Sequence, residues 1–395
     1  MTTKRILFVD DEPNVLQGLR RMLRTLRDQW QFEFAAGGPQ ALDCLAAAPC
    51  DVVLTDMRMP GMDGAELLHA VMQRHPTTVR IVLSGQCDRH TVLKCVGPAH
   101  QFLTKPCDAD TLKATVGRAC SLCDALAGSP HKGTLSRVTA VPSPPGLHDE
   151  LVAELTSASA SLRRVTEIMA RDVGMTAKLL QLVSTSFFGS PQRVPHAAAA
   201  IRLLGLDTLK PLALTAGVWE RCDLVCVDDG WLGRTLDHSL AVACAAEAIA
   251  RLETADPVLV GDAFLGGLLH EVGALALASS CPPDSRQVPA GDAAEWQADQ
   301  LAAEASAYLM ALWGLPPPIV TAIALQPSPV RSTDQAFTAL TAVHVAHACL
   351  RAECAGGGAG PGAVDAAYLQ RIGCAARLDL WRDACLSAPR ERVCP

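Results

Sequence analysis

The chain is 395 residues long, carries a formal net charge of −7 and contains 4% aromatic residues. A chain of this length is expected to form two domains, each large enough to bury its own core. The acidic balance and the scarcity of aromatics argue against a nucleic-acid partner, because a groove for nucleic acid needs basic stripes and stacking platforms.

The cysteines and the longest apolar stretch bear on the compartment. The chain contains 16 cysteines, and its first residues lead into an apolar run without the apolar region of a signal peptide. We therefore expect reduced thiols and a cytoplasmic protein. The most apolar stretch, 263–278, includes His270 and Glu271 and is too short to span a membrane comfortably, so we expect a core helix and no membrane contact.

Four short apolar runs in the N-terminal part each end in polar residues. These polar residues are, in chain order, Asp10 with Asp11, Asp56, Ser84 and Lys105. The runs alternate with helical patterns, which predicts a parallel sheet with crossover helices. Because ligands bind beyond the carboxyl ends of the strands in such a sheet, we expect the carboxylates, the hydroxyl and the ammonium to meet at one edge.

This set of side chains suits reversible phosphorylation of a carboxylate. Clustered carboxylates repel one another and so favour a divalent cation, and their hard oxygen ligands favour Mg²⁺. Asp56 follows a buried strand and is the expected nucleophile, which would form an acyl phosphate. Mg²⁺ and the Lys105 ammonium would neutralise the phosphoryl oxygens, while Ser84 would donate a hydrogen bond to them.

Residues 1–122 resemble a two-component receiver domain, and their motifs follow the order of that family. The motifs are the acidic pair 10–11, the phosphoacceptor loop 55–64, the hydroxyl of Ser84, the ring of Phe102 and the segment 104–106. The resemblance implies a doubly wound α/β fold with a five-stranded parallel sheet, a sensor histidine kinase or phosphotransfer protein as phosphoryl donor, and a cis Lys105–Pro106 bond. It also implies the Mg²⁺ ligands, which are Asp10, Asp11, Asp56 and the carbonyl of Met57.

Four residues are expected to tune or read out phosphorylation. Arg58 and Gln86 each lie two residues beyond a predicted site residue, where their side chains would overhang the site and influence the attacking water. Simple solvent exposure of both is an equally good interpretation. Movement of Ser84 toward the phosphoryl group would let the Phe102 ring turn inward and give a two-state surface. A fixed core position for Phe102 is the alternative.

Composition and periodicity change after the expected last helix of the receiver. Residues 123–146 contain closely spaced prolines, which end helices and predict a stiff, extended connector. From residue 147 apolar residues recur at helical spacing without strand-like alternation. We therefore predict an all-α domain over 147–347 and a helical extension of it over 348–395.

The second half resembles the HD-related output domain, HDOD. The resemblance rests on the segments 167–183, 187–189, 200–206, 266–273 and 312–316. These are mostly packing motifs, so they imply an HD-like, all-α fold and are weak evidence for activity. The triplet 184–186 departs from the family pattern and reads Ser-Thr-Ser. Together with a receiver, the resemblance implies a response regulator whose HDOD domain binds a downstream protein.

HDOD modules are similar to HD-type phosphohydrolases, which hold metals with His and Asp ligands on neighbouring helices. The candidates for such ligands are His238, His270, Glu271 and His347, with His344 as an alternative to the last. Glutamate is one methylene longer than the expected aspartate, and the segment 322–327 has no histidine. We therefore expect scattered histidines and no hydrolytic centre. A receiver-controlled, metal-dependent phosphodiesterase of cyclic nucleotides or dinucleotides is the alternative.

Together these features predict a bacterial response regulator that is phosphorylated on Asp56 and is not itself an enzyme. Mg²⁺ is the one cofactor expected, with no organic cofactor. The expected partners are the phosphoryl donor and an unidentified downstream protein bound by the helical domain, and a homodimer through the receiver is left open. A DNA-binding regulator is disfavoured because no basic recognition helix follows a glycine-containing turn.

Overall fold

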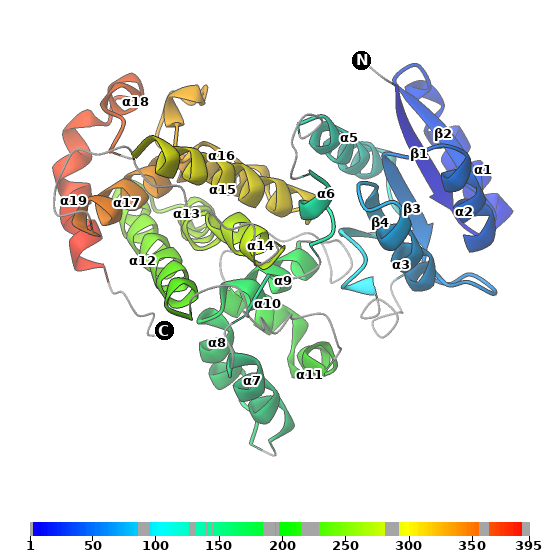
Figure 1. Cartoon of the computed structure of the whole chain (residues 1–395), viewed down its shortest axis with the longest axis horizontal. Coiled ribbons are helices and arrows are strands. Elements are labelled where there is room, and N and C mark those ends of the chain that lie inside the picture. Colours follow the sequence, from blue (N-terminus) through cyan, green and yellow to red (C-terminus); the bar gives the residue numbers. More distant parts are fainter. Residues whose placement is uncertain are drawn as a thin grey trace.

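The computed structural model describes residues 3–85, 95–125, 132–138, 141–143, 146–157, 159–184, 194, 197–214, 229–280, 292–354 and 363–388. It contains an N-terminal α/β unit followed by a helical region, and the two lie side by side (Figure 1). The expected fold class, a doubly wound parallel sheet followed by an all-α domain, is confirmed.

The N-terminal unit is a five-stranded sheet in the order β2-β1-β3-β4-β5, with every pair of neighbouring strands parallel. The strands are β1 (Lys4–Val9), β2 (Trp30–Ala35), β3 (Val52–Asp56), β4 (Val79–Gly85) and β5 (Gln101–Lys105). The flanking helices are α1 (Pro13–Met22), η1 (Arg24–Leu26), α2 (Gly38–Ala47), α3 (Gly64–Arg74) and α5 (Ala109–Ala125).

The central strands are buried on both faces. Residues 6–9 of β1 and 52–55 of β3 are buried without interruption. Helices cover both faces of a doubly wound sheet, so its inner strands are continuously apolar and do not alternate. The polar residues at the ends of these strands are therefore placed by a rigid core.

The connector between the two units is buried at Leu135, Ser136, Val138 and residues 141–143. It contains the short helix α6 (Lys132–Leu135). The Ser136 hydroxyl lies 2.9 Å from the Tyr308 hydroxyl of the helical region, and the Arg80 guanidinium of β4 donates to the Ser136 carbonyl at 3.2 Å. A Cβ atom on Gly174 would lie 2.6 Å from the Val141 carbonyl oxygen. These parts of the connector pack against both units.

Beyond residue 146, all the regular secondary structure that the structure describes is helical. The longer helices are α7 (Leu147–Thr156), α8 (Leu162–Ala170), α9 (Val173–Val183), α10 (Ala197–Leu204), α11 (Leu206–Leu214), α12 (Asp229–Glu253), α13 (Pro257–Leu269), α14 (Val272–Ser280), α15 (Asp292–Leu312), α16 (Pro317–Leu325), α17 (Ala339–Cys354), α18 (Ala366–Arg371) and α19 (Leu378–Ser387). The short 3-10 helices are η4 (Pro329–Arg331) and η5 (Ala375–Arg377).

The C-terminal helices share a core with α12, α13 and α17. The Trp381 side chain of α19 is fully buried, and its indole N–H donates to the Glu253 carboxylate at the end of α12 over 2.8 Å. The Arg377 guanidinium binds the same carboxylate at 2.7 Å. This arrangement ties the C-terminal segment to the helical region.

One stretch among the described residues, Pro257–Ser279, is long and apolar enough to cross a membrane, and 72% of its most apolar window is buried in the fold. It covers α13, the turn at His270 and α14. Burial of this kind is what a core helix of a globular domain requires.

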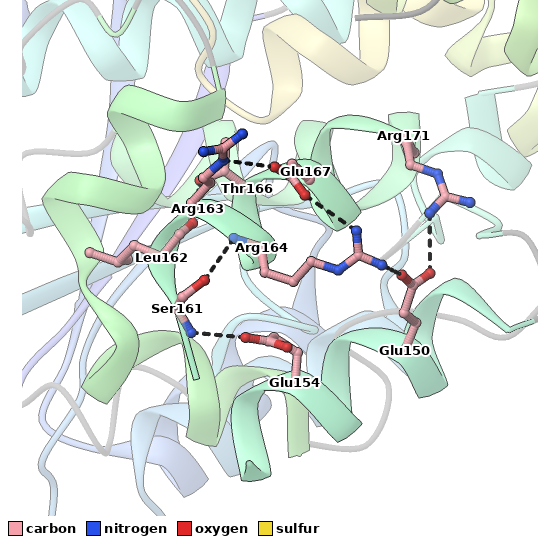
Figure 2. Close-up of polar contacts among 9 residues, drawn as sticks. All are labelled: Glu150, Glu154, Ser161, Leu162, Arg163, Arg164, Thr166, Glu167 and Arg171. Atoms are coloured by element: carbon pink, nitrogen blue, oxygen red, sulfur yellow. Dashed lines mark hydrogen bonds and ion pairs between the residues drawn. The ribbon is translucent and has the colours of Figure 1, made fainter. Parts of the chain in front are cut away.

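Helices α7 and α8 meet in an exposed network of caps and ion pairs (Figure 2). The Ser161 hydroxyl caps α8 by accepting from the Arg164 amide at 3.1 Å, and the Ser161 amide donates to Glu154 in α7 at 2.8 Å. The Arg164 guanidinium reaches Glu150 of α7 and also Glu167, the latter at 3.2 Å. The cap satisfies an amide in the first turn of α8, and the ion pairs link α8 to α7.

Candidate functional site

The predicted acidic and basic residues meet at the carboxyl edge of the sheet. The Lys105 ammonium, at the end of β5, lies 2.6 Å from a carboxylate oxygen of Asp10 and also contacts the Asp56 carboxylate. Asp10 follows β1 and Asp56 ends β3. One ammonium therefore joins the ends of β1, β3 and β5.

The two carboxylates differ in their surroundings. Asp10 is buried, and one of its oxygens accepts from the Glu12 amide at 2.9 Å. The Asp56 side chain is 14% exposed, and one of its oxygens accepts from the Arg58 amide at 2.6 Å. Asp56 is thus held by backbone and by Lys105, and its side chain is more exposed than that of Asp10.

Burial and charge act in opposite directions on the titration of this pair. Burial raises the pKa of Asp56, and the hydrogen bond from Lys105 partly offsets the shift. Burial alone would lower the pKa of Lys105, but its hydrogen bonds to Asp10 and Asp56 outweigh burial and raise it. Lys105 therefore stays positively charged at neutral pH.

The donor set fits a hard dication. Asp10 and Asp56 place two carboxylates around the ammonium of Lys105, and Asp11, next to Asp10 in the chain, would be a third donor if its side chain turned toward them. Carboxylate oxygens are the ligands that Mg²⁺ prefers. The Met57 carbonyl, a further predicted ligand, accepts a hydrogen bond from the Gly64 amide at 2.9 Å, so one of its lone pairs is already in use.

A glycine lets the loop after β3 fold back on the site. A Cβ atom on Gly64 would lie 2.2 Å from the carbonyl oxygen of Asp56, too close for any side chain. The next helix starts with a capping box, in which Asp63 accepts from the Glu66 amide at 2.8 Å and Glu66 accepts from the Asp63 amide at 3.0 Å. Both features are readable in the sequence of residues 55–66.

The remaining predicted site residues lie as follows. Ser84 is buried at the end of β4, and its hydroxyl donates to the Gly85 carbonyl at 3.3 Å. Phe102 is 1% exposed, and Arg58 is exposed. Gln86, like the segment 187–189, lies outside the described residues. The Lys105–Pro106 bond is cis, as expected.

Two buried glutamines join the receiver to the helical region, a contact that sequence reasoning missed. The Gln101 amide, at the start of β5, donates to the Leu312 carbonyl at the end of α15 over 3.0 Å. The Gln181 amide, in α9, donates to the His100 carbonyl at 2.9 Å. The available signal was a glutamine that begins a predicted strand and another within a mostly apolar helical segment.

Two buried cations lie at this contact. The Arg80 guanidinium lies 2.7 Å from a ring nitrogen of His100, and burial lowers the pKa of Arg80 to about 10. The Lys178 ammonium, in α9, lies 5.4 Å from the centre of the Trp313 ring. Burial lowers the pKa of Lys178 to about 7. Charges interact more strongly in such a buried environment than at a solvated surface, so a change in the charge of either residue would alter the stability of this contact more than it would at the surface.

Three of the HD-type candidates come together in the helical region. The ligand nitrogens of His238, His270 and His347 all lie within 4.8 Å of one another. Burial lowers the pKa of both His238 and His270 to about 4, so their imidazoles are neutral at neutral pH. Glu271 lies beside them, 3.9 Å from His270. The expectation of scattered histidines is therefore wrong for these three.

His344 is separate from this group in its bonding. One of its ring nitrogens lies 2.8 Å from the Gln326 carbonyl oxygen, and the Asp365 amide donates to the other at 2.9 Å. Both nitrogens are thus engaged, which is the usual state of a structural histidine in a core.

Family comparisons agree with this division of the chain. The response regulator receiver domain matches residues 6–117, and the HDOD domain matches residues 141–329. With the parallel sheet described above, the first match identifies residues 6–117 as a response regulator receiver domain. The second match follows it, so the chain has a receiver domain followed by an HDOD domain.

Individual relatives are similar over part of the chain. The hydrogenase transcriptional regulatory protein HoxA of Cupriavidus necator is 35% identical over 139 residues, which is 35% of this chain and 28% of that one. The response regulator protein PilR of Pseudomonas aeruginosa is 32% identical over 123 residues, 31% of this chain and 27% of that one. The chain thus spans little more than a quarter of these relatives.

Among solved structures, the signal receiver domain of an HD domain-containing protein from Pseudomonas fluorescens is 33% identical. It covers 30% of this chain and 96% of that chain, with a TM-score of 0.29.

Proposed function

We propose that a sensor histidine kinase or phosphotransfer protein phosphorylates Asp56, and that the HDOD domain then binds a downstream protein without catalysing a reaction. The observation that carries this proposal is the contact of Lys105 with both Asp10 and Asp56. An ammonium in this position neutralises the charge that develops on a transferred phosphoryl group, which is the main demand of the reaction.

Mg²⁺ would be held by Asp10, Asp11 and Asp56, with the second lone pair of the Met57 carbonyl as a further donor. When bound, it would neutralise phosphoryl oxygens alongside Lys105. Ser84 would donate its hydroxyl to the phosphoryl group, and Arg58 and Gln86 would influence the access of water. The protein would act in the cytoplasm, and a receiver homodimer would be compatible with this scheme.

Strand β5 offers a path from the phosphorylation site to the HDOD domain. Its last residue, Lys105, contacts Asp56, and its first residue, Gln101, is bonded to the end of α15. Phe102 is buried between them. A phosphoryl group on Asp56 would draw Lys105 and Ser84 toward it, and a packed strand shifts between discrete positions and does not deform smoothly. We infer that this shift loosens the two glutamine contacts.

The full chain with Mg²⁺ and beryllofluoride, a phosphoryl mimic, tests both steps. Wild type should form an acyl phosphate with acetyl phosphate, and beryllofluoride should speed hydrogen exchange in 309–315 and 177–183, the segments that contact β5. Asp56→Asn should lose both responses, because it lacks the nucleophilic oxygen.

Asp110→Asn is a matched control, since the Asp110 side chain is 96% exposed and is paired with Lys113 of the same helix. It should behave as wild type. Equal phosphorylation of Asp56→Asn would refute the assignment of the phosphoacceptor. Normal phosphorylation with unchanged exchange in both segments would refute the path through β5.

A further inference from the structure

The three clustered histidines come from three separate helices and face a common centre. His238 lies in α12, His270 directly follows α13 and His347 lies in α17. The centres of their rings are 5.6, 5.4 and 5.0 Å apart, and the planes of each pair are inclined by 62°, 65° and 63°. The three ring centres therefore form a nearly equilateral triangle. Hydrophobic packing alone would not select such a regular arrangement.

The bonding of His270 directs a free lone pair into this arrangement. Its Nδ1 lies 2.6 Å from the Gly267 carbonyl oxygen, and a carbonyl can only accept, so Nδ1 carries the proton. In the neutral ring Nε2 is then an acceptor. This Nε2 atom is buried and has no hydrogen-bond partner among the described residues. Metal-bound histidines are commonly oriented in this way, by a hydrogen bond from the other nitrogen.

The glycine that accepts this hydrogen bond also allows the helices to approach. A Cβ atom on Gly267 would lie 2.8 Å from the backbone of Ala243, so α13 packs directly on the backbone of α12. This close contact brings His238 and His270 within reach of each other. The same residue therefore sets both the distance between two histidines and the orientation of one ring.

A carboxylate completes the donor set. Glu271 lies 3.9 Å from His270 Nε2, and its other oxygen is 3.5 Å from the Ser239 hydroxyl, next to His238 in α12. The side chain of Glu271 is 25% exposed, so it can turn toward the cluster. The neighbouring cation Arg351 is paired with Asp299. A dication between the histidines would meet one carboxylate and no unpaired positive charge among the residues described around it.

We propose that His238, His270 and His347, with Glu271 as fourth ligand, bind one first-row transition-metal dication, for which Zn²⁺ is the best match. Imidazole suits zinc, copper, iron and nickel, while Mg²⁺ prefers oxygen ligands. Zn–N bonds of about 2.1 Å place tetrahedral ligand nitrogens about 3.4 Å apart. The ligand atoms now lie within 4.8 Å of one another, so the rings would move inward by no more than about an ångström.

Four protein ligands make this a closed site with a structural role. Structural zinc sites are four-coordinate, whereas catalytic ones keep a position open for water. The metal would fasten α12, the turn between α13 and α14, and α17 to one another. This inference does not depend on the proposed phosphorylation of Asp56, and it holds or fails separately from it.

Zinc binding to the metal-stripped full chain tests the proposal, with Mg²⁺ in excess to occupy the carboxylate site. Wild type should bind about one equivalent of Zn²⁺, and its melting temperature should rise by at least about 5 °C at saturation. His270→Ala and His347→Ala should lose this equivalent. His344→Ala is the matched control, because His344 is equally buried in α17 with both nitrogens engaged, and it should keep the metal.

Two further measurements distinguish ligation by the histidines and Glu271 from binding of zinc by cysteine thiolates. Because the chain has 16 cysteines, Co²⁺ should be substituted for Zn²⁺, and the spectrum should lack the bands that thiolate ligands produce. Glu271→Gln keeps the shape of the side chain, so it should fold normally and weaken zinc binding about 10- to 100-fold. Far-UV circular dichroism and a cooperative melting transition of every metal-free variant confirm that its helical domain is folded.

Three results would overturn the proposal. The first is equal metal content in wild type and in folded His270→Ala and His347→Ala. The second is a Co²⁺ spectrum with thiolate bands that are unchanged in these variants. The third is hydrolysis of bis(p-nitrophenyl) phosphate or a cyclic dinucleotide by the zinc form, lost in His270→Ala, which would mean an open catalytic site in place of the closed one.

Discussion

The receiver site and the histidine cluster are two sets of candidate metal ligands in one chain, and they are built in opposite ways. The receiver set consists of oxygen donors at the ends of strands, with an ammonium already among them. The cluster consists of neutral nitrogen donors between packed helices. The first arrangement suits a hard ion that comes and goes with a phosphoryl group, and the second suits a softer ion that stays.

The largest expected effect separates the two sites. Lys105→Met removes the ammonium but keeps a side chain of similar length. The rate of acyl phosphate formation from acetyl phosphate should fall about 10²- to 10³-fold, as for the loss of one donor to a developing negative charge. Zinc content should not change. A loss of zinc together with the loss of phosphorylation would show that the two sites are coupled. The description of them as two independent metal sites would then be wrong.

The second prediction concerns the close contact of α12 and α13. Gly267→Ala places a methyl group against the backbone of Ala243 and should destabilise the fold by about 1–3 kcal/mol in urea unfolding. It should also separate His238 from His270 and reduce zinc binding. Gly233→Ala is the control, because Gly233 lies in α12 with nothing within 4 Å of an added Cβ. That change should be neutral or stabilising. Equal losses in both variants would contradict the argument from close packing.

The third prediction contrasts two lysines. Burial lowers the pKa of Lys178 from 10.5 to about 7, so between these values the unfolded chain binds more protons than the folded chain and stability rises with pH. Lys105, whose pKa is raised, adds stability that is lost only at higher pH. Urea unfolding at pH 7, 8 and 9 should show stability increasing by about 1 kcal/mol per unit. Lys178→Met should flatten this slope, and an identical slope in the variant would refute the assignment.

The smallest effect is expected on the surface. Arg164→Ala removes the guanidinium that links α7 to α8 in Figure 2. Exposed ion pairs are screened by water, so the melting temperature should change by about 2 °C or less. Phosphorylation and zinc content should stay as in wild type. A drop of about 5 °C or more would mean that this network supports the HDOD fold much more than its exposure suggests.

The contrast between the sites also explains what the sequence could predict. Asp10, Asp56 and Lys105 each follow an apolar run, and parallel strands place their carboxyl ends at one edge whatever the details of packing. Local patterns were therefore sufficient for the receiver site. The meeting of His238, His270 and His347 depends on how α12, α13 and α17 cross, which no local pattern encodes.

The contact between the domains was unpredictable for a related reason. Proline-rich composition predicted a stiff, extended connector, but composition does not say whether a segment is covered. Ser136 of the connector is buried between Tyr308 on one side and Arg80 on the other, residues 228 positions apart in the chain. Whether such a segment is an exposed spacer or part of the core is decided by residues that are distant in sequence.

That buried connector has a consequence for how this architecture can change over generations. A receiver joined by a loose tether can be exchanged for another receiver by a single recombination in the tether. Here Ser136 is bonded to the receiver through its carbonyl and lies beside Tyr308 of the HDOD domain through its hydroxyl. A foreign receiver without an arginine at the position of Arg80 would remove one hydrogen bond from that buried carbonyl. The two domains are therefore expected to be inherited as a matched pair.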